Sequence, residues 1–167
     1  MKNILFILSL LFFVSSCRMS YTFRTASIDY DLTKTLAIGH FVNQAPLVYP
    51  SLEQRFNEEI KDIFTRNTKL QLVSQNGDME IEGEIVGYEL TPMAVQEDAF
   101  ASETKLTMTV IMRFRNNKTD APEMEERISA NRTFPSNTMF DSVQDQLISE
   151  LVDEIIDQIF NATMANW

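Results

Sequence analysis

Hydrophobic and polar residues alternate along four segments of the chain, residues 35–42, 79–85, 105–115 and 124–134. A period of two is typical of a β-strand with one face buried and the other face in water. We therefore predict four strands. The alternation is clearest in the third strand, whose inward positions are Leu106, Met108, Val110, Met112 and Phe114. The inward positions of the second strand are Met79, Ile81, Gly83 and Ile85. Those of the fourth strand are Ile128, Ala130 and Phe134.

Two other segments show apolar residues at helical spacing. Ser51 with Gln54, and Asp141 with Gln144, have the spacing of capping boxes and predict where these two helices begin. The second stripe continues almost to the end of the chain and is wide enough to cover a sheet. The first helix turns one stripe toward the core, formed by Leu52, Phe56, Ile60, Ile63 and Phe64.

The predicted element order is β-α-β-β-β-α. An α+β fold, with two helices packed on one face of a four-stranded antiparallel or mixed sheet, buries all of these apolar faces together. A chain of 167 residues is the size of one domain. We expect residues 35–167 to form it.

The N-terminal residues carry an export signal. Lys2 precedes an apolar run from Ile4 to Val14, which is too short to cross a membrane and is typical of a signal peptide. Val14-Ser-Ser-Cys17 resembles the lipobox of bacterial lipoproteins, in which the cysteine is acylated and becomes the first residue after cleavage. We therefore expect a signal peptide at 1–16, a lipid on Cys17, and a tether over 17–34.

Composition narrows the classes of function. The chain has 14 Lys and Arg against 24 Asp and Glu, a net charge of −10, which disfavours binding to nucleic acid. One cysteine forms no internal disulfide, and one histidine, His40, supplies no metal cluster. Four glycines and no nucleophile elbow leave no recognised phosphate-binding or hydrolase motif. We expect no enzymatic activity, cofactor or metal.

Two features allow a functional interpretation beside a structural one. The second helix has six acidic residues and no Lys or Arg; they form either a solvated face or a surface for a basic partner. The segment 91–103 lacks glycine and contains Met93, Val95 and Phe100. Its apolar side chains either fold back over the core or contact another protein. The six acids are Asp141, Asp145, Glu150, Asp153, Glu154 and Asp157.

Several segments together resemble the LptE family of lipoproteins over residues 17–167. They are Phe41-Val-Asn-Gln-Ala-Pro-Leu-Val-Tyr-Pro50, Lys61-Asp-Ile-Phe64, Pro92-Met-Ala-Val-Gln96 and Ile159-Phe-Asn-Ala-Thr-Met-Ala-Asn-Trp167. The resemblance implies an outer-membrane lipoprotein that plugs the β-barrel LptD, helps it assemble, and assists lipopolysaccharide transport to the outer leaflet. It also implies two helices against a four-stranded sheet.

The family's contacts with lipopolysaccharide have been attributed to basic residues. In this chain the local candidates are Lys105, Arg113, Arg115 and Lys118, and pairing with Glu123 and Glu125 across strands is their alternative role. Two other functions stay open from the residues alone: a free-standing periplasmic lipoprotein that acts as a chaperone or envelope adaptor without a barrel, and an acid-dependent hydrolase.

Overall fold

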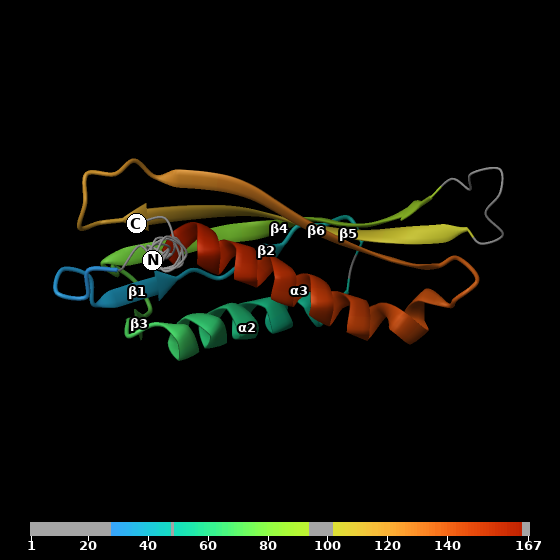
Figure 1. Cartoon of the computed structure of the whole chain (residues 1–167), viewed down its shortest axis with the longest axis horizontal. Coiled ribbons are helices and arrows are strands. Elements are labelled where there is room, and N and C mark those ends of the chain that lie inside the picture. Colours follow the sequence, from blue (N-terminus) through green and yellow to red (C-terminus); the bar gives the residue numbers. More distant parts are fainter. Residues whose placement is uncertain (1–27, 48, 94–101, 165–167) are drawn as a thin grey trace, which may run out of the picture.

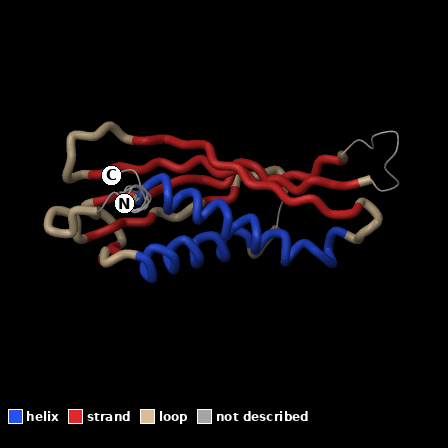
Figure 2. The backbone as a smooth tube through the Cα atoms, in the orientation of Figure 1, coloured by secondary structure: helices blue, strands red, loops and turns tan. Residues whose placement is uncertain are grey.

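The computed structural model describes residues 28–47, 49–93 and 102–164. It has two layers, a long twisted sheet and a pair of helices that cover one face of it (Figure 1). The helices are α2 (Leu52–Asn67) and α3 (Phe140–Met164), and α3 runs along most of the sheet (Figure 2). The predicted α+β class is confirmed.

The sheet is mixed, with strand order β3-β1-β4-β5-β6, and β2 pairs with β4 further along. The three short strands β1, β2 and β3 pair in parallel with their neighbours, whereas β4, β5 and β6 are long and antiparallel. The strands are β1 (Thr35–Ile38), β2 (Val42–Asn43), β3 (Gln71–Val73), β4 (Met79–Pro92), β5 (Glu103–Asn116) and β6 (Met124–Pro135).

The predicted count of four strands is wrong, because the sheet has six. The segment 35–42 is interrupted: between β1 and β2 the chain advances from residue 38 to 42 while its partner β4 advances from 81 to 84. The extra residue breaks the pairing at Phe41, whose ring lies against Gly83. A Cβ on Gly83 would lie 2.6 Å from that ring and 2.3 Å from the Ile111 carbonyl oxygen, so the close approach requires glycine. Strand β3 was missed because three residues are too short to show a period.

The long strands extend past the short ones. Strand β4 continues to Pro92 and β5 begins at Glu103, so the two ends of the predicted 91–103 loop belong to strands. After Ile85, which is the last partner of β2, the sheet consists of β4, β5 and β6 alone. This three-stranded part projects with the β4–β5 hairpin at its tip (Figure 1).

The core lies between the helices and the inner face of the sheet, and every inward position predicted on β5 and β6 is buried. The predicted capping boxes are wrong. Ser51 makes no side-chain cap hydrogen bond, and Gln54 donates instead to Glu58. Helix α3 begins at Phe140, so Asp141 lies inside it, and Gln144 donates to the Tyr88 hydroxyl at 2.9 Å. Neither described helix combines the length and apolarity that crossing a membrane requires.

Candidate functional site

Two ends of the molecule differ in chemistry. We call the end that contains β1, β3 and the β5–β6 turn the proximal end, and the end with the β4–β5 hairpin and the β6–α3 turn the distal end (Figure 1). The first described residues, 28–34, lie at the proximal end. The sequence candidates divide between these two ends.

Three of the four candidate cations lie at the proximal end, and each is paired. Arg113 lies 3.7 Å from Glu125, Arg115 binds Glu80 and lies 3.9 Å from Glu123, and the Lys118 ammonium lies 2.8 Å from Asp78. Arg113 therefore pairs across strands with Glu125, as predicted, and Arg115 lies near Glu123, the residue just before β6. The carboxylate neighbours also raise the pKa of Arg115, chiefly through the hydrogen bond to Glu80.

Asp78 connects the start of the domain to the hairpin turn. Its carboxylate accepts hydrogen bonds from the backbone N–H groups of Lys34 at 2.8 Å and Thr35 at 3.0 Å, in addition to the Lys118 ammonium. The hydrogen bond from Lys118, followed by those from the two N–H groups, holds the pKa of Asp78 well below its usual range. The residues that enter β1 are thus fixed to the sheet by a charged group.

Lys105 differs from the other three candidates. It lies on the outer face of the sheet, away from the helices, between Thr91 on β4 and Thr133 on β6. Within the described ranges no carboxylate pairs with it. Arg127, opposite Ile111 on the same face, is exposed and also lacks an ion pair among the described residues. Sequence reasoning missed Arg127, because strand periodicity places it outward but does not reveal which outward cations lack a partner.

The distal end carries exposed apolar side chains. Leu90 is 37% exposed, Met93 is 42% exposed and Met139, just before α3, is 76% exposed. Of the three residues predicted to contact a partner, Met93 is therefore open to solvent, whereas Val95 and Phe100 lie outside the described residues. Cys17, the predicted lipidation site, also lies outside them.

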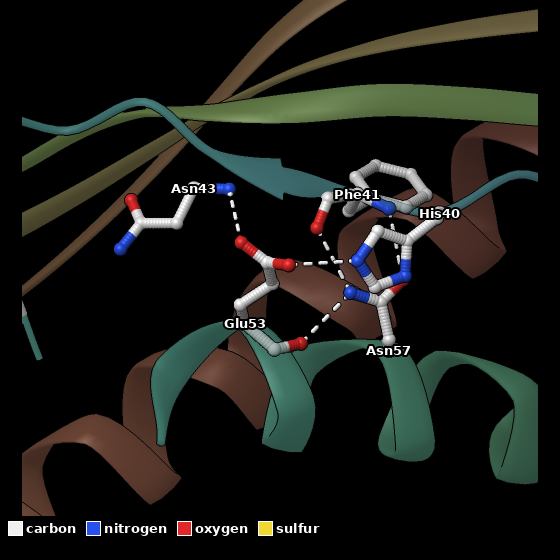
Figure 3. Close-up of polar contacts among 5 residues, drawn as sticks. All are labelled: His40, Phe41, Asn43, Glu53 and Asn57. Carbon is white, nitrogen blue, oxygen red and sulfur yellow. Dashed lines mark hydrogen bonds and ion pairs between the residues drawn. The ribbon is translucent and has the colours of Figure 1, made fainter. Parts of the chain in front are cut away.

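The only histidine belongs to a polar cluster at the start of α2 (Figure 3). Glu53 accepts a hydrogen bond from the Asn43 N–H at 2.9 Å, and its other oxygen lies 2.7 Å from His40 Nε2. These two contacts, the Asn43 bond first, lower the pKa of Glu53. One turn later, the buried Asn57 accepts from the Phe41 N–H at 2.8 Å and donates to the Phe41 carbonyl at 2.9 Å.

The geometry of this cluster fits a role in stabilising the fold. Asn57 supplies the hydrogen bonds that Phe41 loses where β1 and β2 are interrupted, because buried backbone groups need partners. In the part of the chain that the structure describes, the polar partner of His40 is Glu53, and no serine or threonine hydroxyl is hydrogen-bonded to it as a nucleophile would be. Among the described residues, no group of three His, Cys, Asp or Glu side chains is arranged to hold a metal ion.

The acidic side chains of α3 are not all free. Arg132 on β6 reaches over to the helix, with Nε 2.9 Å from Glu150 and Nη1 2.6 Å from Glu154. These contacts raise the pKa of Arg132 and, for Glu150, act with a hydrogen bond from Gln146 to lower the pKa. A basic residue of this chain therefore neutralises two of the six acids, which periodicity alone did not predict.

Comparison with known protein families shows which family this chain belongs to. A family model described as lipopolysaccharide-assembly LptE matches residues 33–163. The chain belongs to the LptE family. This match covers all the described helices and strands except the last residue of α3. No curated protein matches the chain by sequence.

Solved structures share the LptE-like fold at low identity. Rare lipoprotein B from Shewanella oneidensis is 11% identical with a TM-score of 0.58, and the match covers 77% of this chain and 92% of that one. Protein XCC0632 from Xanthomonas campestris is 10% identical with a TM-score of 0.57, covering 79% and 84%. A minor lipoprotein from Acinetobacter baumannii is 15% identical with a TM-score of 0.50, covering 76% and 89%. At such identities the likeness shows the fold alone.

Proposed function

We propose that this LptE-family chain is an outer-membrane lipoprotein that plugs an LptD-like β-barrel, helps the barrel assemble, and takes part in inserting lipopolysaccharide into the outer leaflet. The family match over residues 33–163 is the observation that carries this proposal. The role is one of binding and assembly rather than catalysis. Arg115, Lys118 and Asn57 fit that role, because they are engaged in structural ion pairs and hydrogen bonds.

In this proposal the lipid on Cys17 anchors the chain after removal of residues 1–16, and two or more acyl chains make such an anchor stable. The tether, residues 17–34, then leads to the domain. Its described part already lies against the fold, because Ile28 and Thr33 are buried. Mass spectrometry should find a diacylglyceryl group on Cys17, and Cys17→Ala should release a folded domain into the periplasm. An unmodified N-terminal peptide would remove the anchor.

The difference between the two ends of the molecule supports a contact between the distal end and the barrel. The tether joins the proximal end, where charges are paired, whereas the exposed Leu90, Met93 and Met139 lie at the distal end. Exposed apolar side chains gathered in one place mark a surface that another molecule covers. Met93, Val95 and Phe100 are accordingly the proposed contacts with the barrel.

For lipopolysaccharide, a phosphate-bearing glycolipid, the contact requires cations that are not neutralised within the domain. Lys105 and Arg127 meet that requirement among the described residues, whereas Arg113, Arg115 and Lys118 must first leave a carboxylate. We expect Lys105→Ser and Arg127→Ser to weaken lipopolysaccharide binding more than Arg113→Ser or Lys118→Ser. Binding of labelled lipopolysaccharide to the purified domain measures this order, and the reverse order would contradict the assignment.

The decisive experiment is a pull-down from solubilised outer membranes through a tag at the C-terminus of the intact lipoprotein. A plug should copurify with a large β-barrel in mild detergent. Recovery of the lipoprotein without a barrel, with the domain folded, would favour a free-standing chaperone or envelope adaptor. Repeating the pull-down with Cys17→Ala separates a requirement for the anchor from a requirement for the interface.

A further inference from the structure

A groove of about 440 Å³ lies between α2 and α3. Glu59 from α2 and Asp153 and Asp157 from α3 line it, together with the buried Ile156 and the half-buried Ile63. Because Ile156 is fully buried, the apolar contact area beside the three carboxylates comes mainly from Ile63. An occupant has to be cationic and partly apolar to suit both.

The charges in this groove are unbalanced within the described chain. Arg66, at one end, is already bound to Asp62 at 2.6 Å and lies 3.4 Å from Glu59. Asp153 and Asp157 are one helical turn apart, where like charges repel each other. Within the described ranges neither of these two aspartates has a hydrogen bond or an ion pair, in contrast to Glu150 and Glu154, which bind Arg132.

One segment of the same chain has the complementary chemistry. Residues 18–27 contain Arg18 and Arg24 beside apolar and aromatic side chains, and they contain no acid. Every acidic residue of the protein lies at position 29 or later. The cations of this segment therefore find carboxylates only in the domain or in another molecule. The apolar and aromatic members of the segment are Met19, Tyr21, Phe23 and Ala26.

The segment 18–27 also ends close to the groove, because the residues that follow it lie near the C-terminal end of α2. Ile28 is buried against the core, and the Lys69 ammonium lies 5.7 Å from the centre of the Tyr30 ring. Lys69 follows closely on Asn67, the last residue of α2, which lines the groove. Ten extended residues span up to about 33 Å, and a helix of 16 residues such as α2 is about 24 Å long. Residues 18–27 can therefore reach along the whole groove.

We propose that residues 18–27 lie in the groove between α2 and α3, with Arg24 and Arg18 paired to Asp153, Asp157 and Glu59 and with Phe23 on Ile63. The pairing removes the repulsion between the two aspartates and holds the lipid-bearing end beside the helical layer. The domain then sits close to the membrane with its distal end directed away from the anchor. This inference concerns the chain alone and stands whether or not the barrel proposal holds.

Disulfide cross-linking tests the position of the segment in the full mature chain. Cys17 is the only cysteine, so Cys17→Ser gives a cysteine-free background. Phe23→Cys is combined with Asn67→Cys at the groove, or, as the matched control, with Asn131→Cys on the opposite face of the sheet. Under mild oxidation we expect an intramolecular disulfide in the first pair and at most a trace in the second. Equal yields from both pairs would overturn the proposal.

Charge reversal tests the electrostatic basis. Asp153→Lys with Asp157→Lys should lower the cross-linking yield about fivefold, the size expected for two exposed ion pairs, and salt near 1 M should do the same. Arg18→Glu with Arg24→Glu should also lower the yield. Combining the two sets should restore it, which a merely unfolded variant cannot do.

A control pair, Asp141→Lys with Glu126→Lys, adds the same charge away from the groove and should leave the yield unchanged. Thermal unfolding of each variant confirms that the domain is folded. Cross-linking yields that stay the same in all the charge-reversal variants would overturn the proposed ion pairs. Disulfide-linked dimers in place of the intramolecular product would assign the groove to a second copy of the chain and would overturn the intramolecular contact.

Discussion

The proximal and distal ends of the molecule are parts of one sheet, yet their surface side chains differ: charged groups are paired at one end and apolar groups are exposed at the other. At the proximal end Asp78, Glu80, Arg113, Arg115 and Lys118 pair with charged groups or backbone N–H groups inside the domain. At the distal end Leu90, Met93 and Met139 are left exposed. The charged groups at the proximal end are satisfied within the domain, although Leu32 there is 60% exposed, whereas the distal end leaves three apolar side chains exposed that an interface would bury.

The sheet topology explains why the ends differ. Strands β1, β2 and β3 and helix α2 surround the proximal half of β4, so both its edge and its inner face are covered there. Beyond Ile85 none of the described strands pairs with the edge of β4 opposite β5, and Glu89, Leu90 and Thr91 are exposed. The proximal half of β4 is therefore more fully covered by this chain's own elements than the distal half, whose exposed apolar residues are the contacts proposed above for a partner.

The largest expected effect comes from the core that joins the two halves. Val110 is fully buried in the row formed with Ile85 and Ile128. Val110→Asp would bury an unpaired carboxylate, which costs several kcal/mol out of a total stability of about 5–15 kcal/mol. We expect loss of cooperative unfolding in a thermal melt and degradation in the cell.

The neighbouring residue provides the control. Ile111 lies on the outer face of the same strand, between Glu84 and Arg127, and Ile111→Asp should reduce the melting temperature far less. Similar losses from both substitutions would mean that the outer face is also part of a core. Leu151→Asp on α3, which is equally buried, should behave like Val110→Asp.

The sequence predicted this core correctly because the alternation of apolar and polar residues reflects which face of a strand is buried. All five inward positions of β5 are buried, as are Ile128, Ala130 and Phe134 on β6. Short elements escape the same logic: β2 and β3 have two and three residues and are defined by their pairing partners rather than by their own pattern. The first helix begins at Leu52, directly after Ser51, as predicted, whereas α3 begins at Phe140, one residue before the predicted cap Asp141; a capping-box spacing does not ensure a cap hydrogen bond. Ser51 makes no such hydrogen bond.

The second prediction concerns the proximal half at the Asn57 side chain, which is 5% exposed. Asn57→Leu keeps the branching and the number of side-chain heavy atoms but leaves the Phe41 N–H and carbonyl without partners. Each such buried group costs about 1–3 kcal/mol. Asn67→Leu, an exposed position of the same helix, is the matched control and should change stability little. Chemical denaturation measures both. Equal and small effects would show that water replaces Asn57 at this site.

The third prediction is a pH dependence at the proximal end. The pKa of Asp78 is lower in the folded than in the unfolded state, so its charged form stabilises the fold at neutral pH. That contribution is complete above the unfolded pKa of about 3.9 and is lost as the pH falls toward the folded pKa. Asp78→Asn should therefore lower the melting temperature between pH 5 and 7 and differ less from the wild type as the pH falls below about 4.

Lys118→Met tests the main cause of the Asp78 shift. It should raise the pKa of Asp78 and move the acid transition to higher pH, because the Lys118 ammonium makes the largest contribution. Arg127→Met, an exposed cation with no ion pair among the described residues, is the control. A constant difference between Asp78→Asn and the wild type down to the lowest pH would contradict a charge-dependent role.

The functional residues were harder to predict than the core, for a physical reason. Which outward cations are neutralised depends on strand register: Arg115 lies opposite Glu80, whereas Lys105 lies opposite Thr91. The register is fixed by distant pairings that a single sequence does not state. The Arg132 contacts with α3 depend on how the helix crosses β6. The apolar segment 91–103, in contrast, stood out from composition alone.

The smallest effect on the domain's own stability is expected at the distal end. Met93 is exposed, and surface substitutions normally change stability by less than about 0.5 kcal/mol. Apolar anchors at an interface can each cost more than about 1 kcal/mol when truncated. Replacing Met93, Val95 and Phe100 with serine should leave the melting temperature of the isolated domain unchanged and abolish copurification with the barrel.

A matched triple substitution at polar positions of the outer face, the half-buried Thr107→Ser and the exposed Asn131→Ser and Thr133→Ser, controls for the number of changes. It should leave both stability and copurification intact. A large drop in melting temperature with copurification retained in the distal variant would show that these three side chains only cover the core of this domain. The distal half would then be as self-sufficient as the proximal half, because its exposed residues would serve the fold rather than a partner.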